Sequence, residues 1–499
     1  AARSPKVSVA DVHANVDACV AEAADAVRSD GAKLVVLPEL CVTGYTCEDL
    51  FWQDELLDAA ERGLRTLAER TTVLDALVLV GIPARVNDKL YNCAAALAHG
   101  ELLGLVPKRN IPNYNEFYEA RHFAAGPTDV SHVRFAGWEN IPFGTSQLFA
   151  CSTLLQLKVA VEVCEDLWVA SPPSIAHAQA GATVIWRCHA GAEGAGEAAD
   201  YAWAFLDRYL EDVDLVVVSR PEYRPPYIED ERCAVLAPSI DADSPKNRVL
   251  DLDEAWSVAR LSGIFAGEPP FEAVPFLRHD GRADAFRGLT DDPVLAGGPV
   301  PLGARVITQV NRWDRLKGGL ELVEAFAENI AVLPEDAHLL LVGPTPDGPE
   351  SQATLAQIVE RCSVLPESVA SRIHVAAVSM EDREVNATVV NAVQRVSSVV
   401  TQRSLIEAFG LTVAEAMWKK APVVASAVGG IRDQIDDGVD GVLVDPTDGV
   451  AWAEAVRDLL LFPERAQEMG LAAHESVRRE FLSNRHLQDL LQIVADLVG

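Results

Sequence analysis

Three reactive side chains in the first third of the chain lie just beyond, or within, short apolar runs. Glu39 follows "KLVVL", Lys108 follows "LLGLVP", and Cys164 lies in "VAVEVCEDLW". A carboxylate can accept a thiol proton, a thiolate can attack an amide carbon, and an ammonium can stabilise the resulting oxyanion. Because strand ends converge at one rim of a sheet, we expect these residues to meet in space. Together they predict a site that cleaves amides.

A second group of charged residues lies in the last 200 positions and indicates a diphosphate ligand. Arg312 and Lys317 in "QVNRWDRLKGG" follow an apolar run and place two cations near a helix start, where backbone N–H groups also favour anions. Glu407 and Glu415 stand with seven residues between them, around a glycine-containing turn that opens a helix. A carboxylate there can accept ribose hydroxyls, and the amides of the turn can meet phosphate.

The elements that position the first group alternate between short strands and helices from Lys33 to about Ile185. The runs "KLVVLPEL", "ALVLVGIP", "LKVAVEVCEDLW" and "GATVIW" are typical of buried strands. The stretch "VDACVAEAADAVRSDG" has helical periodicity and ends on Gly31, a residue suited to a helix C-cap. This alternation predicts an α/β layer architecture.

A strand over "VDLVVVSR" follows, and the composition then changes. Residues 236–301 are rich in Pro, Gly and Asp and are interpreted as an interdomain connection. From Ala304, strands alternate with helices in the pattern of a parallel, doubly wound sheet, and a long helical tail begins near Val450. The predicted domains are residues 1–184, 185–300 and 301–499.

Composition limits the possible partners. The 499 residues are 49% hydrophobic and carry a formal net charge of −32, so binding to a nucleic-acid backbone would work against a repulsive field. No run reaches the roughly 18 apolar residues needed to span a membrane, and the first residues lack the apolar core of a signal peptide. The nine cysteines form no C-x-x-C pair. We expect a soluble, cytoplasmic protein, and the sequence does not indicate its oligomeric state.

The first third resembles the carbon–nitrogen hydrolases of the nitrilase type, and in particular the glutaminase domain of glutamine-dependent NAD synthetases. The resemblance rests on "LPELCVTGYTCEDLFWQ", "VPKRNIPNYNEFYEARHF" and "VEVCEDLWVASPPSIAHAQAGATVI". It implies that Cys164 is the nucleophile, Glu39 the general base, Lys108 the oxyanion stabiliser and Glu119 a supporting glutamate, with glutamine as the substrate.

After "AGATVI" this resemblance ends. The family continues with further strands that complete a four-layer sandwich, whereas this chain continues with "WRCHAG". We find no candidate for the Ser-Gly-Gly phosphate loop of the synthetase domain, so we do not expect NAD synthesis.

From about Thr183 the chain resembles retaining glycosyltransferases of the GT-B fold, in the branch of the trehalose synthases and trehalose phosphorylases. The segments "VIWRCHAG", "VNRWDRLKG" and "SLIEAFGLTVAEAMWKKAPVVA" carry this resemblance. It implies that Arg312 and Lys317 bind the donor diphosphate, Glu415 the ribose and Glu407 the donor sugar. His189 would face the acceptor, although a structural histidine explains that residue too.

Two departures from the second family stand out. Ala408 occupies a position where the family more often has glycine, and residues 1–182 replace most of the acceptor-binding Rossmann domain. The expected fold is α/β, with partial nitrilase-like layers fused to a GT-B donor domain.

Three functions remain open at this point. The chain could transfer glucose from UDP- or ADP-glucose to a glucose-like acceptor, it could hydrolyse glutamine, or it could bind a nucleotide sugar without turnover. None of these functions requires a tightly bound cofactor or a metal ion.

Overall fold

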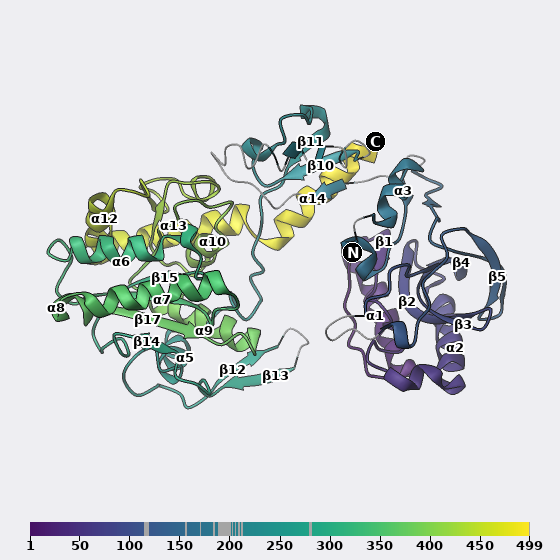
Figure 1. Ribbon diagram of the computed structural model, residues 1–499, viewed down its shortest axis with the longest axis horizontal. Helices are drawn as coiled ribbons and strands as arrows, with labels where there is room; N and C mark the ends of the chain where they lie inside the picture. Colours follow the sequence, from purple (N-terminus) through teal and green to yellow (C-terminus); the bar gives the residue numbers. More distant parts are fainter. Residues whose placement is uncertain are drawn as a thin grey trace. The chain divides into compact units, whose positions relative to one another are not determined.

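The computed structural model divides into two compact units, a smaller one mainly of residues 1–185 and a larger one mainly of residues 215–497 (Figure 1). The structure describes residues 1–113, 119–154, 157–169, 171–182, 185–187, 201, 203, 204, 206, 207, 210, 213–278 and 282–498.

The smaller unit contains a six-stranded sheet in the order β1-β2-β3-β4-β6-β5 within the described residues. The pairs β2–β3, β3–β4 and β5–β6 are antiparallel, whereas β1–β2 and β4–β6 are parallel. The elements are α1 (Val12–Asp30), β1 (Leu34–Val36), η1 (Glu48–Trp52), α2 (Asp54–Thr71), β2 (Leu77–Val86), β3 (Lys89–Ala98), β4 (Glu101–Pro107), η2 (Glu119–Arg121), β5 (Ser131–Phe135), β6 (Trp138–Phe143), β7 (Phe149–Ala150), β8 (Lys158–Val159), η3 (Cys164–Trp168) and α3 (Pro173–Gln179).

Helices α1 and α2 pack against each other and against the sheet, and together they enclose the core of this unit. The side chain of Asp11 caps the start of α1 by accepting a hydrogen bond from the Ala14 amide, and Gly31 ends the helix with a φ of 66°. Only glycine adopts this left-handed conformation at little cost, which is why the sequence pattern located the end of α1.

The larger unit contains a seven-stranded sheet in the order β14-β17-β16-β15-β18-β19-β20 within the described residues, together with the short sheets β11-β10-β9 and β12-β13. Its elements are β9 (Ile185–Arg187), β10 (Leu215–Val218), η4 (Pro221–Tyr223), η5 (Asp230–Arg232), β11 (Cys233–Val235), α5 (Leu252–Leu261), β12 (Val274–Leu277), β13 (Ala283–Phe286), β14 (Val294–Ala296), β15 (Arg305–Val310), η6 (Arg315–Lys317), α6 (Gly319–Glu328), β16 (Ala337–Pro344), α7 (Pro349–Val364), α8 (Glu367–Ala370), β17 (Ile373–Val378), α9 (Arg383–Val396), β18 (Val399–Gln402), α10 (Leu411–Trp418), β19 (Val423–Ser426), α11 (Ile431–Gln434), β20 (Val442–Val444), α12 (Gly449–Leu461), α13 (Pro463–Glu480) and α14 (Ser483–Val498).

The central strands of the seven-stranded sheet are parallel and buried on both faces. Ile307 and Leu339 join the core that contains residues of α6, α7 and α12, whereas Val306 and Leu340 join the core that contains residues of α5 and α9. Successive side chains of a strand point to opposite faces, so each strand contributes to two cores. The predicted doubly wound parallel sheet is therefore confirmed, with β14 added antiparallel at one edge.

Two segments differ from the sequence-based expectation. Residues 236–301, interpreted as a connection, contain helix α5, the β12–β13 hairpin and strand β14. Closely spaced Pro and Gly residues hid these short elements, although the capping box of Asp251 and Glu254 marks the start of α5. The run "LKVAVEVCEDLW" forms only the two-residue strand β8 before the turn η3, because Cys164 has a φ of 49°, which interrupts extended backbone.

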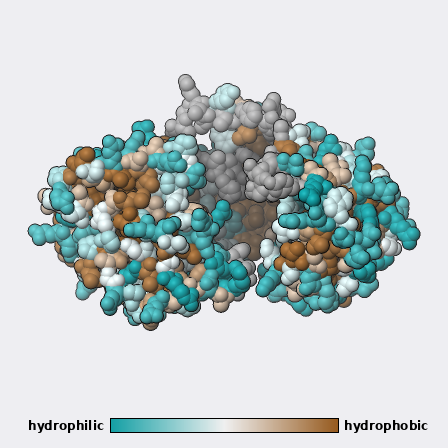
Figure 2. Space-filling view, turned by 60° about the horizontal axis from the view of Figure 1, so that its bottom comes forward, coloured by the Kyte–Doolittle hydropathy of each residue, from teal (hydrophilic) through white to brown (hydrophobic). Residues whose placement is uncertain are grey.

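The surface agrees with the acidic composition. Figure 2 shows hydrophilic residues spread over both units on the face in view. Within the described residues, no helix combines the length and apolar character that a membrane crossing requires.

His338 of β16 and His374 of β17 form a stacked pair at neighbouring positions of the large sheet, with ring centroids 5.2 Å apart. Nδ1 of His374 lies 2.8 Å from the Gly298 carbonyl oxygen and so carries a proton, which leaves Nε2 of His374 to accept from Nδ1 of His338 at 2.9 Å. Burial lowers the pKa of both imidazoles, that of His338 to about 4. The folded unit therefore holds a neutral pair.

Acid should weaken the larger unit through this pair. An unfolded histidine has a pKa of about 6.5, so between about pH 6.5 and pH 4 the unfolded state binds more protons and stability falls as pH falls. Replacing His338 by Gln should reduce the acid-induced loss of unfolding free energy by an amount on the order of 1 kcal/mol. Calorimetric unfolding at pH 7.5 and pH 5 measures this, with the exposed His13→Gln variant as control. If the free energy of unfolding falls by the same amount in His338→Gln as in the unaltered protein, the histidine pair is not the source of the loss.

Candidate functional site

The smaller unit brings four of the predicted residues to one side of its sheet. Glu39 lies three residues beyond β1, Lys108 directly follows β4, Glu119 opens η2 and Cys164 opens η3. Glu39 and Cys164 both line a cavity of about 290 Å³. The expectation that Glu39, Lys108 and Cys164 meet in space is thus confirmed, although they lie up to 125 residues apart in the sequence and Cys164 does not end a strand of the six-stranded sheet.

Lys108 is fully buried between two carboxylates. Its Nζ atom lies 2.8 Å from Oε1 of Glu39 and 2.7 Å from Oε1 of Glu119. Burial alone lowers the pKa of Lys108, but the hydrogen bonds and charges of the two glutamates outweigh it and raise the pKa above its ordinary value. Lys108 therefore stays positively charged between the two carboxylates.

Three further residues order this cluster, and the sequence analysis missed them. Asn92 donates to Oε1 of Glu39 at 2.6 Å, and the Tyr45 hydroxyl donates to Oε1 of Glu119 at 2.7 Å. Buried Asp166 accepts from the backbone amides that directly follow Lys108, at 2.7 Å from that of Asn110, and so ties the Cys164 turn to the lysine loop. Only the adjacency of Asp166 to Cys164 in "CEDLW" could have signalled this role.

The Cys164 thiol is held in its protonated form in the free protein. Partial burial and the negative charge of Glu39 raise its pKa, while the charge of Lys108 acts in the opposite direction. Because Glu39 lies beside the thiol, it is placed to accept the thiol proton when an electrophile binds. The arrangement can perform nucleophilic attack on an amide with a carboxylate base.

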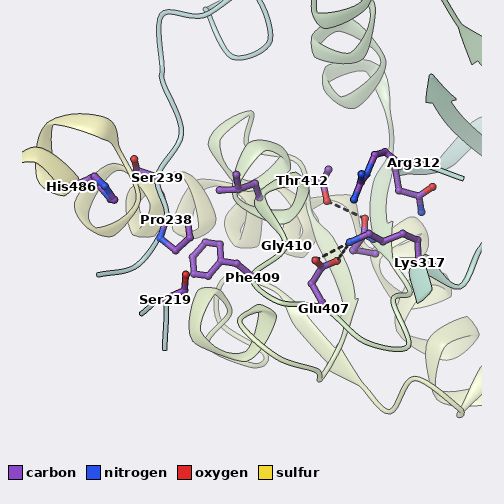
Figure 3. A pocket seen from close by; sticks show the side chains of 13 residues that line it. Ser219, Pro238, Ser239, Arg312, Lys317, Glu407, Phe409, Gly410, Thr412 and His486 are labelled. Atoms are coloured by element: carbon purple, nitrogen blue, oxygen red, sulfur yellow. Dashed lines mark hydrogen bonds and ion pairs between the residues drawn. The ribbon is translucent and has the colours of Figure 1, made fainter. Parts of the chain in front are cut away.

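The larger unit holds a second and roomier pocket of about 600 Å³ (Figure 3). Asn311 and Arg312 follow β15, and Lys317 ends η6. Residues 403–410 connect β18 to α10, and the pocket lining includes part of this connection and the start of α10. Neighbouring parallel strands β15 and β18 both end here, at the edge of the sheet where ligands of such folds bind.

Lys317 and Glu407 form the charged centre of this pocket, which we call the donor pocket after the sugar donor that the sequence predicts. The Nζ atom of Lys317 lies 2.8 and 2.7 Å from the two carboxylate oxygens of Glu407, and the Ser404 hydroxyl donates to the same carboxylate at 3.0 Å. Glu407 is 8% exposed and Lys317 is 20% exposed. Two of the three Lys317 donors are thus used by Glu407, which leaves one for a ligand.

Two glycines allow the loops to approach this closely. A Cβ atom at Gly318 would lie 2.0 Å from the Arg403 carbonyl oxygen, and one at Gly429 would lie 1.6 Å from the Glu407 carbonyl oxygen. Both glycines have positive φ angles of 66° and 48°. The position of the Lys317–Glu407 pair therefore depends on backbone contacts that a larger residue would block.

The remaining predicted residues have different environments. Arg312 lines the donor pocket and is exposed, and within the described residues no side chain pairs with its guanidinium. Glu415 is buried on α10 and does not line the pocket; its carboxylate pairs with Lys246 at 2.8 Å. His189 lies outside the described residues. The structure therefore brings Arg312, Lys317 and Glu407 together, with Glu415 one helical turn away from them.

Residues of the segment after β10 support the donor pocket from its other side, and the sequence analysis did not identify them. The Tyr223 hydroxyl donates to the Ala408 carbonyl oxygen at 2.7 Å, and Arg220 pairs with Asp433 of α11. Ser219 lines the pocket. Among the described residues, no group of three or more His, Cys, Asp or Glu side chains is arranged to hold a metal ion.

Two family models match the chain. Residues 1–209 match carbon-nitrogen hydrolase, and residues 296–476 match glycosyl transferases group 1. The predicted two-part composition is confirmed: the first part is similar to carbon-nitrogen hydrolases and the second to group 1 glycosyl transferases.

Curated relatives differ for the two parts. The glutamine-dependent NAD(+) synthetase of Mycobacterium tuberculosis is 42% identical over 185 residues, which is 37% of this chain and 27% of that protein. The trehalose synthase of Pyrococcus horikoshii is 33% identical over 320 residues, 63% of this chain and 64% of that protein. The chain thus spans about a quarter of the first relative and less than two thirds of the second.

Among solved structures, the sucrose-phosphate synthase from Thermosynechococcus elongatus is similar with a TM-score of 0.45 at 22% identity, covering 64% of this chain and 68% of that one. Anabaena HepE in complex with UDP-glucose gives a TM-score of 0.47 at 14% identity, covering 65% of this chain and 76% of that one.

The electrostatics of Cys164 predict its alkylation profile. The pH midpoint for reaction with iodoacetamide should lie above that of an ordinary thiol, and Glu39→Gln should lower this midpoint because the raising charge is removed. Rates resolved by mass spectrometry of the Cys164 peptide measure it, and Cys151, which is not among the residues around Glu39, serves as the internal control. A midpoint that is unchanged or higher in Glu39→Gln would contradict the electrostatic description.

Proposed function

We propose that the larger unit is a retaining glycosyltransferase that transfers glucose from UDP- or ADP-glucose to a glucose-like acceptor, giving trehalose or a related disaccharide. The observation that carries this proposal is the Lys317–Glu407 pair beside Arg312 in one pocket at the ends of two parallel strands. The family match of residues 296–476 and the likeness to trehalose synthases support the same activity.

Each part of the donor has a matching group. Arg312 and the third donor of Lys317 suit the diphosphate, together with the free backbone amides at the start of α10, where the helix dipole also favours negative charge. The Glu407 carboxylate suits the hydroxyl groups of the sugar. Glu415, one turn further along α10, suits the hydroxyls of the ribose.

The reaction needs no nucleophile from the protein. The bond between C1 of glucose and the diphosphate oxygen breaks, the acceptor hydroxyl forms its bond to C1 on the same face, and its proton passes to the departing diphosphate. Retention of configuration follows from attack on that face. Arg312 and Lys317 stabilise the negative charge that develops on the leaving group, which is where preorganised cations lower a barrier most.

Donor binding tests this proposal. Lys317→Ala should weaken binding of UDP- or ADP-glucose by about one to two decades, because a hydrogen bond to a charged group contributes roughly 1.5–3 kcal/mol. Titration calorimetry on the full chain measures this, with Lys317→Arg to retain the charge and the exposed Lys89→Met as control. If neither donor nor its free diphosphate binds at millimolar concentration, the glycosyltransferase assignment fails.

Hydrolysis of glutamine in the smaller unit is a second candidate function, favoured by the assembly of Glu39, Lys108, Glu119 and Cys164. The thiolate would attack the amide carbon, Glu39 would take the thiol proton and pass it to the departing ammonia, and water would release glutamate. In the described residues, only the two-stranded β7–β8 sheet accompanies the six-stranded sheet of this unit. The described part of this unit therefore encloses the Cys164 thiol and a bound substrate only partly.

We expect ammonia release from glutamine to be slow, because a displacement of about 1 Å can reduce a rate a hundredfold. Cys164→Ala should abolish the release, and the distant Cys233→Ala should leave it unchanged. A coupled ammonia assay measures both. A turnover number in the ordinary enzyme range of about 1–1000 s⁻¹ that is lost in Cys164→Ala would make glutamine hydrolysis the principal function instead.

A further inference from the structure

A short segment before α5, residues 241–248, is attached firmly to helices α9 and α10, and we call it the strap. Asn391 of α9 donates to the carbonyl oxygens of Pro245 and Arg248, both at 3.0 Å. Trp418 of α10 donates to the Asn247 carbonyl oxygen at 3.1 Å. Side chains from two helices thus satisfy the backbone of the strap, which fixes its path across the start of the donor domain.

Lys419 at the end of α10 adds a buried contact to the strap. Its Nζ atom donates to Oδ1 of Asn247 at 2.9 Å and to the Glu415 carbonyl oxygen at 3.0 Å. Burial lowers the pKa of Lys419 to about 7, partly opposed by the charge of Glu415. At neutral pH, therefore, Lys419 is a weak source of positive charge for the carboxylate of Glu415.

Lys246, also in the strap, is the side chain that pairs with the Glu415 carboxylate. Its Nζ atom lies 2.8 Å from Oε2 of Glu415, whose side chain is only 7% exposed, while Lys246 is 34% exposed. A buried carboxylate without a partner is costly, so removing Lys246 would leave the Glu415 carboxylate without this compensating charge. The strap thus supplies a cation to the Glu415 carboxylate.

Glu415 lies on the side of α10 that continues the donor pocket. Leu411 and Thr412, four and three residues earlier, both line that pocket. Residues at this spacing share one face of a helix, and helical side chains incline toward the N-terminus. The Glu415 side chain therefore inclines along α10 toward the turn that carries Leu411 and Thr412.

We infer that Lys246 is a positioning residue for the nucleotide: its ion pair holds the Glu415 carboxylate in place, so that the carboxylate accepts the 2′ and 3′ hydroxyls of the ribose. This inference rests on the proposed function of the larger unit. A carboxylate has about four acceptor sites on its two oxygens. Lys246 contacts Oε2 as an ion pair at 2.8 Å, and within the described residues Oε2 accepts no hydrogen bond.

The inference links nucleotide affinity to the strap. Because Lys246 is carried by the segment that precedes α5, any displacement of the strap from α9 and α10 would also remove the partner of Glu415. Loss of the ribose contact would follow, while Arg312 and Lys317 would keep their contacts with the diphosphate.

Selectivity for the ribose diol provides the test. Calorimetry on the full chain would compare UDP and ADP with the 2′,3′-dideoxy form of each. We expect the natural diphosphate to bind about tenfold more tightly than its dideoxy form, and Lys246→Met to reduce this preference to about twofold. Lys246→Arg should retain the preference, and Lys89→Met should match the unaltered protein.

A double variant separates positioning from a general loss of structure. Glu415→Gln should remove the ribose preference to the same extent as Lys246→Met, and combining them should add no further loss, because both act through one contact. If Lys246→Met still binds the diphosphates and keeps the full ribose preference, the positioning role of Lys246 is wrong, while the proposed function stands. Failure of the unaltered protein to bind either diphosphate would overturn the proposed function together with this inference.

Discussion

The ion pair between Lys317 and Glu407 joins the loops that leave two neighbouring strands of the large sheet, and the donor pocket is built around it. Both groups are largely removed from water, so each depends on the other for charge compensation. The close backbone contacts at Gly318 and Gly429 bring the loops near enough for this pair to form. Arg312 and the start of α10 line the same pocket as this pair. A charged ligand thus meets a pocket whose cation is already held in position.

In the smaller unit, too, buried groups of opposite charge hold each other in place, but here one cation compensates two carboxylates. One buried cation, Lys108, serves two carboxylates, Glu39 and Glu119, and the raised pKa of Lys108 reflects how strongly they stabilise its charged form. Partial burial, together with the negative charge of Glu39, raises the pKa of the Cys164 thiol. The same arrangement of charges therefore orders the cluster and disfavours ionisation of the Cys164 thiol.

The sequence predicted the elements and residues that depend on local pattern. Apolar runs located many of the strands, and the rule that strand ends meet at one rim grouped Glu39 with Lys108 and Cys164. In the second half, the resemblance to glycosyltransferases grouped Lys317 with Arg312 and Glu407. The contacts between Lys246 and Glu415, and between Asp166 and the amides after Lys108, could not be predicted. They join segments that are distant in sequence through single side chains, which leave no periodic signal. Helix α5 was missed because short elements between prolines and glycines are too brief for a recognisable period.

The central claim is that the larger unit transfers glucose with retention of configuration. The most direct measurement is NMR analysis of the products formed from UDP- or ADP-glucose with excess glucose. The account predicts a disaccharide in which the donor glucose keeps its α configuration, alongside some free glucose from hydrolysis of the donor. A β-linked product would contradict retention, and donor binding with neither disaccharide nor free glucose would reduce the larger unit to a nucleotide-sugar binding module.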